Sequence, residues 1–157
     1  LDAHADLRNG YLGFDYSHAS IINNCLKLFS KNHRLIQYGI RSGTKEEFLL
    51  IKKNKYRELS LTSLVEKINL ISDNTPIYLT IDLDFLDPSI FPGTGTREVG
   101  GETFHGLMTI LKSLKTKRLF GADLVELAPN IDPTGISTIL ATTVFRELLI
   151  LLHISKH

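Results

Sequence analysis

The first six residues place three potential metal ligands at two-residue spacing. Asp2, His4 and Asp6 alternate with small apolar residues. On an extended backbone every second side chain points to the same face, so this triplet can present several ligands to one metal site. A polar turn is the alternative for these residues, and their spacing leaves it open.

A second stretch, residues 78–96, begins as an apolar run and ends in carboxylates. Residues 76–81 contain one polar side chain, which is typical of a strand covered on both faces in a parallel sheet. Asp82 and Asp84 follow directly, and on an extended backbone their side chains would share one face. Two like charges that leave an apolar strand together are costly unless a cation holds them.

These side chains fall at the predicted carboxyl ends of strands, where open α/β sheets bind ligands. So many charges suit two divalent ions that share bridging carboxylates rather than one small ion. Oxygen ligands with a histidine and no thiolate favour Mn²⁺, with Zn²⁺ or Fe²⁺ as alternatives. Two ions roughly 3.5–4 Å apart can hold a hydroxide at neutral pH, so hydrolysis is the implied reaction class. The set comprises Asp2, His4, Asp6, Asp82, Asp84 and Glu126.

Alternating helix and strand patterns predict the elements that position this set. Thr44 with Glu47 predicts a capping box at one helix start, and Ser63 with Glu66 suggests another. Strands that alternate with helices of 10–15 residues predict an α/β fold with a mostly parallel sheet. The predicted helices cover 18–29, 45–56, 61–71, 104–114 and 132–151, and the predicted strands cover 35–40, 76–81 and 118–127.

Apolar spacing also predicts which helix faces are buried. In the first helix we expect Ile22, Leu26 and Phe29 to face a core, with Cys25 as a small core residue. In the last helix the residues expected to face the core are Ile136, Ile139, Leu140, Val144, Leu148 and Leu151.

The composition predicts one globular domain. The 157 residues are 43% hydrophobic and 22% charged, and the formal net charge is +1, so no bulk electrostatic argument favours nucleic acid or an anionic membrane. The single Cys25 forbids an internal disulfide and fits a reducing compartment. The sequence shows no uninterrupted apolar run of about 18 residues and no leader pattern, so we expect no membrane segment.

Three other features have simpler explanations. The glycines of residues 92–96 suggest a phosphate cradle, but the loop lacks the Gly-Lys-Ser/Thr ending of a P-loop. Cys25 lies at an apolar helix position with no neighbouring charge to lower its pKa, which argues against a nucleophile. His18 precedes a helix, where a lone histidine is more often a cap or a surface residue.

Several motifs in order along the chain resemble the ureohydrolase family, most closely its agmatinase-like branch. That resemblance implies a three-layer α/β/α fold around a parallel sheet, as in arginases and deacetylases. The motifs are Asp-Ala-His-Ala-Asp at 2–6, Ser-His-Ala-Ser at 17–20, Ile-Asp-Leu-Asp-Phe-Leu-Asp-Pro at 81–88, Pro-Gly-Thr-Gly-Thr at 92–96, Gly-Gly at 100–101 and Asp-Leu-Val-Glu-Leu-Ala-Pro at 123–129.

The resemblance implies a metal-dependent hydrolysis. Asp2 and Asp82 would bridge two Mn²⁺ ions, His4 and Asp84 would complete one ion, and Asp6 would serve the other. The hydroxide between the ions would attack the guanidinium carbon of agmatine and yield urea and putrescine, a step of polyamine biosynthesis. Guanidinobutyrate, arginine and formiminoglutamate are the alternative substrates.

The same resemblance assigns roles outside the metal ligands. Glu126 would anchor the guanidinium group, and His18 would become a proton shuttle for the leaving amine. Asp87 is expected to cap a turn before Pro88, and Asp123 to be structural. Relatives of this kind are cytoplasmic and assemble into trimers or hexamers, which we expect here too.

The sequence departs from the family in two places. The family has an upstream Gly-Gly-Asp-His segment that supplies one more histidine ligand, and residues 1–157 contain no counterpart. We therefore expect 1–157 to be the C-terminal portion of a single ureohydrolase domain, incomplete at its N-terminus. The alternative to an enzyme is a catalytically incomplete remnant or assembly module. Arg97 stands where many relatives carry proline and is expected to alter the lining of the substrate channel.

Overall fold

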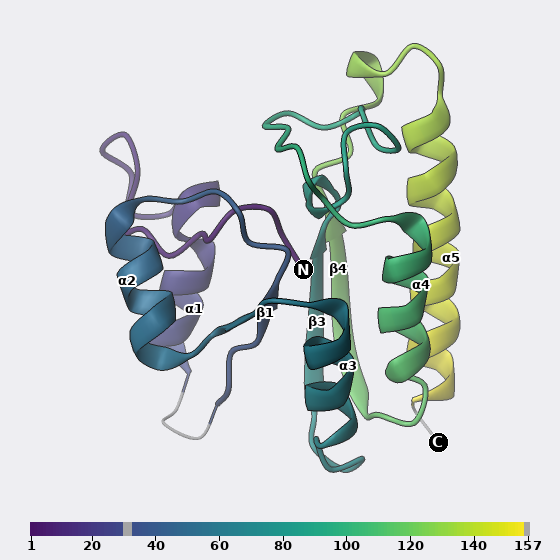
Figure 1. The fold of residues 1–157 in the computed structure, drawn as a ribbon, viewed down its shortest axis with the longest axis horizontal. Helices are drawn as coiled ribbons and strands as arrows, with labels where there is room; N and C mark the ends of the chain where they lie inside the picture. Colours follow the sequence, from purple (N-terminus) through teal and green to yellow (C-terminus); the bar gives the residue numbers. More distant parts are fainter. Residues whose placement is uncertain (30–32, 156–157) are drawn as a thin grey trace.

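The strands run parallel in two separate pairs. The computed structural model describes residues 1–29 and 33–155 (Figure 1). The short pair joins β1 (Gln37–Tyr38) to β2 (Arg57–Glu58). The longer pair joins β3 (Ile77–Asp82) to β4 (Leu119–Val125), with Thr80 opposite Asp123. The predicted α/β class with parallel strand pairing is confirmed.

Helices follow the strands as predicted, and most have shorter bounds. Figure 1 shows α3, α4 and α5 beside the β3–β4 pair, and α1 and α2 beside β1. The helices are α1 (Ile21–Leu28), α2 (Lys45–Asn54), α3 (Leu61–Asn69), α4 (Phe104–Ser113) and α5 (Ile136–Ile154), and the 3₁₀ turns are η1 (His18–Ser20), η2 (Leu83–Phe85) and η3 (Pro129–Ile131).

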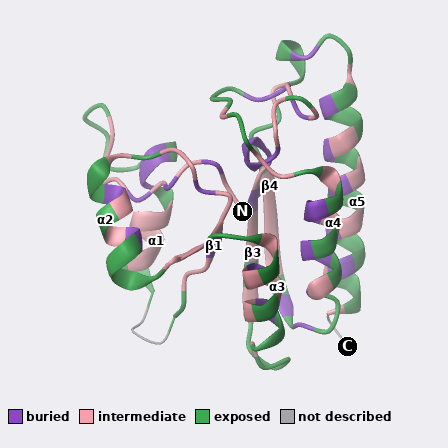
Figure 2. Ribbon diagram, viewed as in Figure 1, coloured by how far each residue is buried: buried purple, intermediate pink, exposed green. Residues whose placement is uncertain are grey.

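The main hydrophobic core lies between the β3–β4 pair and helices α3 to α5. The side chains that leave β3 are among the most deeply buried, with Ile81, Leu83 and Phe85 each 0% exposed. Figure 2 shows that the buried positions of α4 and α5 lie along one side of each helix. A smaller cluster holds α1 and α2 on β1, with Leu7, Ile40 and Ile51 at its centre. The end of β3 is therefore anchored by core packing.

The first two residues connect the two strand pairs. The Leu1 ammonium donates to the Thr80 carbonyl at 2.9 Å, and the Asp82 amide donates to the Leu1 carbonyl at 2.9 Å. On the other side, the Asp2 amide donates to the Tyr38 carbonyl at 3.1 Å. Among the described residues β1 and β3 form no direct ladder. Residues 1–2 lie between them at the strand ends.

The sequence predicted the buried face of the last helix only in part: Val144, Leu148 and Leu151 are buried as expected. Ile136 and Ile139 are 53% and 70% exposed, although both were expected to face the core. The helix begins at Ile136 rather than near Asp132, and the Ser137 hydroxyl accepts a hydrogen bond from the Gly93 amide at 2.8 Å. That bond holds Ser137 against the Gly93 loop, so the buried side of the helix begins at Ser137 and not at Ile136. The buried positions are Ser137, Ala141, Val144, Leu148 and Leu151.

Other local predictions were only partly right. The capping box of α2 is confirmed, but that of α3 pairs Ser60 with Ser63 and not Ser63 with Glu66. In α1, Phe29 is 57% exposed, and the expected core residue Cys25 is only half-buried. Helix α1 therefore packs more loosely than its apolar spacing predicts.

Helix α5 is the described segment that bears on the expectation of no membrane segment. Its 19 residues are long and apolar enough by length and composition, with a mean hydropathy of 1.5, and 28% of that window is buried. One side of the helix packs on the core, and the core helix of a soluble protein passes the same test. Length and composition alone therefore do not assign it to a membrane.

Candidate functional site

Asp82 and Asp84 converge through a turn and not through an extended strand. Strand β3 ends at Asp82, and η2 begins at Leu83. The Asp82 Oδ1 accepts a hydrogen bond from the Asp84 amide at 2.9 Å, so it caps the turn. The Asp84 carboxylate is buried and accepts the Ala3 amide at 3.0 Å. The extended backbone that the sequence predicted for this pair is therefore wrong.

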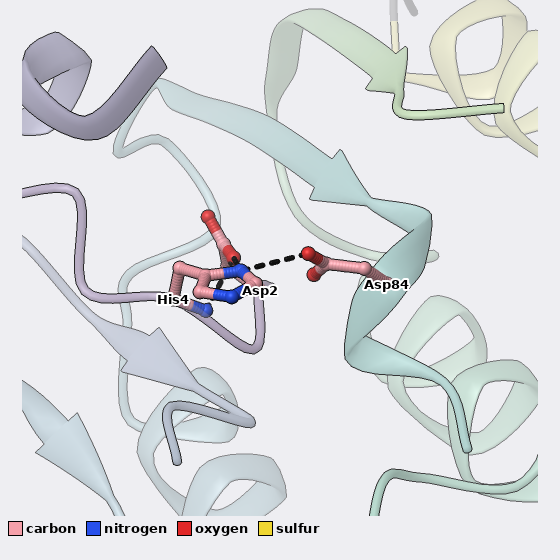
Figure 3. Close-up of side chains that lie close together, drawn as sticks. All are labelled: Asp2, His4 and Asp84. Carbon is pink, nitrogen blue, oxygen red and sulfur yellow. Dashed lines mark hydrogen bonds and ion pairs between the residues drawn. The ribbon is translucent and has the colours of Figure 1, made fainter. Parts of the chain in front are cut away.

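Asp2, His4 and Asp84 form the most compact group of potential ligands (Figure 3). The His4 Nδ1 lies 2.8 Å from the Asp84 Oδ2 and 3.8 Å from the Asp2 Oδ1. The Asp2 Oδ1 also accepts the His4 amide at 2.6 Å. One ligand atom from each of the three residues lies within 4.8 Å of the others. Asp6 and Asp82 lie outside this group.

Asp6 and Glu126 share an unusual backbone conformation. Their φ angles are +53° and +64°, in the left-handed region that costs a side-chain-bearing residue about 1 kcal/mol. The Asp6 carbonyl accepts the Ile22 and Asn23 amides at 3.1 and 3.2 Å, so the bend at Asp6 is tied to the start of α1. The Ala128 amide donates to the Gly93 carbonyl at 2.7 Å just after Glu126. Strain of this kind persists where surrounding contacts impose it, as often occurs at functional sites.

One cavity of about 390 Å³ brings the predicted site residues together. Its wall also includes Arg8, Tyr11, Glu47, Arg97 and Glu98. His18 is exposed there, with its ring edge-on to Tyr11 at 5.4 Å between centroids. The predicted site residues that line it are Asp2, His4, Asp6, His18, Asp82, Asp84 and Glu126.

Burial and neighbouring charges raise the pKa of three carboxyl groups. Burial is the largest cause for Asp2, followed by the charges of Asp6 and Asp84. Burial also raises the pKa of Asp82, and the charges of Asp2 and Asp84 add to it. The pKa of Asp6 rises to about 6, again mainly through burial. In the absence of a cation, these groups therefore retain protons to unusually high pH.

The contact between His4 and Asp84 shifts both pKa values so that each group favours its charged form. The hydrogen bond to Asp84 raises the pKa of His4. Burial alone would raise the pKa of Asp84, but hydrogen bonds from His4, Ala3 and Asp82 hold it below its usual value. Asp84 is thus the carboxylate that keeps its charge.

This donor set fits divalent ions. Buried like charges are relieved by a cation, and oxygen donors with one imidazole nitrogen suit Mn²⁺. The Asp2, His4 and Asp84 group could hold one ion, while Asp6 and Asp82 lie in the same cavity wall and could contribute to another.

Glu47 is a site neighbour that the sequence identified only as a helix cap. Its side chain is buried and accepts the Leu7 amide at 2.9 Å, the Thr44 amide at 2.8 Å and the Arg8 Nε at 3.4 Å. It therefore holds the segment that follows Asp6 against α2. The capping box was the only local signal, and nothing in it marks contact with residues about forty positions away.

We expect Glu47→Gln to destabilise the protein by about 2 kcal/mol. The glutamine amide nitrogen would face a backbone N–H that the carboxylate oxygen now accepts, so a buried donor would lose its partner. Urea denaturation measures the change. Glu46→Gln, on the exposed neighbouring position, is the matched control and should leave stability unchanged within about 0.5 kcal/mol.

Other predictions about carboxylates agree with the geometry. Asp87 accepts the Ser89 amide at 3.0 Å, as expected of a turn cap, and also the Gly100 and Gly101 amides at 2.9 and 3.1 Å. Asp123 accepts the Thr80 hydroxyl at 2.7 Å and does not line the cavity, which suits a structural role. The Arg97 side chain does line the cavity, with its Nε bonded to the Pro92 carbonyl at 2.7 Å.

Comparison with known sequences identifies relatives across nearly the whole chain. The arginase family model matches residues 1–151. An agmatinase of Bacillus anthracis is 38% identical over 155 residues, covering 96% of this chain and 53% of the relative. An agmatinase of Neisseria gonorrhoeae is 36% identical, covering 96% and 50%. The chain thus spans about half the length of the curated relatives it matches.

Solved structures share the fold. A Clostridium difficile protein provisionally described as an agmatinase superposes with a TM-score of 0.89 at 41% identity, covering 96% of this chain and 56% of that one. The proclavaminate amidino hydrolase of Streptomyces clavuligerus gives 0.82 at 27% identity, covering 98% and 54%. Arginase from Medicago truncatula gives 0.74 at 33% identity, covering 98% and 49%. The described helices and parallel strands therefore form part of the three-layer fold expected from the sequence.

Proposed function

The chain belongs to the arginase family, and on that premise we propose that its protein hydrolyses a guanidino compound and releases urea. Agmatine is the proposed substrate, with putrescine as the second product. The relatives named agmatinase, two of them 38% and 36% identical, support this choice. Guanidinobutyrate, arginine and formiminoglutamate are the alternatives to test.

One observation carries the proposal. Seven side chains from four separate segments line a single cavity. They combine a set of potential metal ligands with the carboxylate of Glu126 and the imidazole of His18. A purely structural cluster would not place Glu126 in the same cavity wall as Asp2 and Asp84.

The proposed cofactor is a pair of Mn²⁺ ions. Asp2, His4, Asp6, Asp82 and Asp84 would hold them. When bound, such ions supply a hydroxide nucleophile at neutral pH.

The chain's own residues would orient the substrate and move a proton. The Glu126 carboxylate would accept charge-assisted hydrogen bonds from the planar guanidinium group and hold it over the ligand cluster. His18, exposed at the cavity wall, would pass a proton to the amine that leaves. His18 and Glu126 would thus act as catalytic and substrate-binding groups, while Asp6 would hold metal beside them.

Urea release from a substrate panel tests the proposal. The Mn²⁺-loaded protein is incubated with agmatine, guanidinobutyrate, arginine and formiminoglutamate, and urea is measured for the first three and formamide for the last. We expect the highest kcat/KM with agmatine. No urea from any of the first three substrates would contradict a ureohydrolase activity.

Metal stoichiometry separates an enzyme from a remnant. Isothermal titration of the 157-residue chain with Mn²⁺ should give two tight sites if the chain carries a complete centre. Only the Asp2, His4 and Asp84 group is compact among the described residues, so a single tight site would instead favour a catalytically incomplete remnant or assembly module.

We further propose a cytoplasmic protein that assembles as a trimer or hexamer. The substrate is a small soluble molecule, and no role with nucleic acid or membranes is proposed. Size-exclusion chromatography with light scattering measures the assembly, and a monomer at micromolar concentration would contradict it.

A further inference from the structure

Arg41 donates hydrogen bonds only to main-chain carbonyls among the described residues. A guanidinium group has five N–H donors in fixed directions. Here they reach six carbonyl oxygens from three segments of the chain. The contacts are Nε to Val99 at 3.2 Å, Nη1 to Gly39 at 3.1 Å and Phe85 at 3.2 Å, and Nη2 to Asp84 at 2.9 Å, Leu86 at 3.5 Å and Glu98 at 2.7 Å.

These carbonyls belong to the two loops that flank the ligand cluster. Residues 84–86 form the end of the η2 turn, whose carbonyls lack helical partners and attract a cation. Residues 98–99 follow the glycine-rich loop. A single side chain from the segment after β1 therefore ties both loops to each other and to the Gly39 carbonyl.

Arg41 does not line the cavity that holds the ligand cluster. It lines a separate cavity of about 320 Å³ together with Arg57 and Glu102. Its donors are occupied by carbonyls, so it has no free group to offer a substrate. Any effect of Arg41 on the site must therefore act through other residues.

His4 lies between the two residues whose main chain Arg41 holds most closely. The His4 Nδ1 is 2.8 Å from the Asp84 Oδ2, and the His4 Nε2 is 3.7 Å from the Glu98 Oε1. Ligating histidines are commonly oriented by a partner at the second ring nitrogen. Glu98 can supply that partner only while its loop stays beside η2.

We propose that Arg41 is a positioning residue of the metal centre: it holds the main chain of Asp84 and Glu98, so that the Glu98 carboxylate orients the His4 ring at Nε2 while Nδ1 faces the ligand cluster beside Asp84. The inference rests on the metal site of the proposed function and adds the residue that maintains its geometry. Arg41 acts from outside the cavity through hydrogen bonds to the backbone.

Arg41→Lys tests the proposal. Lysine keeps the charge but offers three donors on a flexible stem and cannot span the same carbonyls. We expect the affinity for Mn²⁺ to fall about 10-fold, measured from the electron paramagnetic resonance signal of free Mn²⁺ during titration. Far-UV circular dichroism and thermal unfolding of the metal-free protein check that the variant is folded.

Arg57→Lys is the matched control. Arg57 lines the same separate cavity and donates to one carbonyl, that of Ile40, at 3.1 Å. We expect this variant to change thermal stability without changing the affinity for Mn²⁺. If Arg41→Lys likewise lowered stability and bound Mn²⁺ as the wild type does, Arg41 would be merely structural and the inference would be overturned.

Glu98→Gln supplies a second variant that does not disturb the core. The Glu98 side chain is 38% exposed, so the protein should tolerate the change. We expect it to weaken Mn²⁺ binding in the wild type and to weaken it much less in the Arg41→Lys background, because the loop is already displaced there. Additive effects would contradict the inference. If the wild-type protein bound no Mn²⁺, the proposed function would fail first.

Discussion

Asp82→Asn is expected to abolish the metal centre and yet stabilise the metal-free protein. The variant should bind Mn²⁺ at least about 100-fold more weakly, because it removes a proposed ligand rather than an outer contact. Its amide oxygen can still accept the Asp84 amide, so the η2 turn is kept. We expect the metal-free variant to be more stable by about 1–4 kcal/mol near pH 7, since each unit of raised pKa corresponds to about 1.4 kcal/mol.

The stability gained by Asp82→Asn in the metal-free protein should depend on pH. A carboxyl group whose pKa is raised in the folded state binds more protons there than in the unfolded chain. The metal-free wild type should therefore lose stability as the pH rises from about 4 through the raised pKa values, and Asp82→Asn should reduce that slope. Thermal unfolding at pH 5, 7 and 9 with a chelator measures the slope.

Asp123→Asn is the control for Asp82→Asn. Asp123 lies on the adjacent strand and accepts the Thr80 hydroxyl, but it does not line the cavity. Its replacement should leave Mn²⁺ affinity unchanged. Wild-type Mn²⁺ affinity in the Asp82→Asn protein would contradict the assigned ligand set.

Glu126→Gln is expected to reduce kcat/KM for the guanidino substrate by about 10- to 150-fold. The change keeps the shape of the side chain but removes the charge that strengthens hydrogen bonds to the guanidinium group by about 1.5–3 kcal/mol. Steady-state urea release measures the loss. Affinity for Mn²⁺ should stay at the wild-type value, because Glu126 is not among the proposed ligands.

A control variant and a comparison of two measured quantities test whether Glu126→Gln acts on substrate binding. Glu147→Gln changes the same residue type on α5, outside the cavity lining, and should leave kcat/KM unchanged. If Glu126→Gln altered Mn²⁺ affinity and kcat/KM by the same factor, Glu126 would act on the metal rather than on the substrate. An unchanged kcat/KM would contradict its role as an anchor.

The site residues that the sequence predicts line one cavity, and several of them lie next to a strong local pattern. The apolar run before Asp82 marks the end of a buried strand, and alternation marks Asp2 and His4. The sequence did not predict how Asp82 and Asp84 converge, since the 3₁₀ turn depends on the Asp82 side chain capping the Asp84 amide. Local spacing predicts which side chains are close in sequence, but it does not predict the turn that brings them together.

Residues that act across long sequence separations were missed for a different reason. Arg41 contacts carbonyls up to 58 positions away, and Glu98 contacts His4 at a still larger separation in the chain. No local pattern encodes such contacts. The predicted strand 35–40 shrank to Gln37–Tyr38 because a strand extends only where a partner pairs with it, and β2 offers Arg57–Glu58. Strand pairing and contacts between distant loops depend on the tertiary structure, so local sequence patterns do not predict them.

The contacts between residues 1–4 and 80–84 also govern when the site can form. Ala3 meets Asp84 across 81 positions, and Leu1 meets Thr80 across 79. Closing a loop of about 80 residues costs roughly 4 kcal/mol of chain entropy, and such non-local contacts form slowly. The ligands therefore assemble late in refolding, after the β3–β4 core exists to receive the first residues. Metal uptake would then report the last kinetic step, and Mn²⁺ would select molecules that have already folded instead of nucleating them.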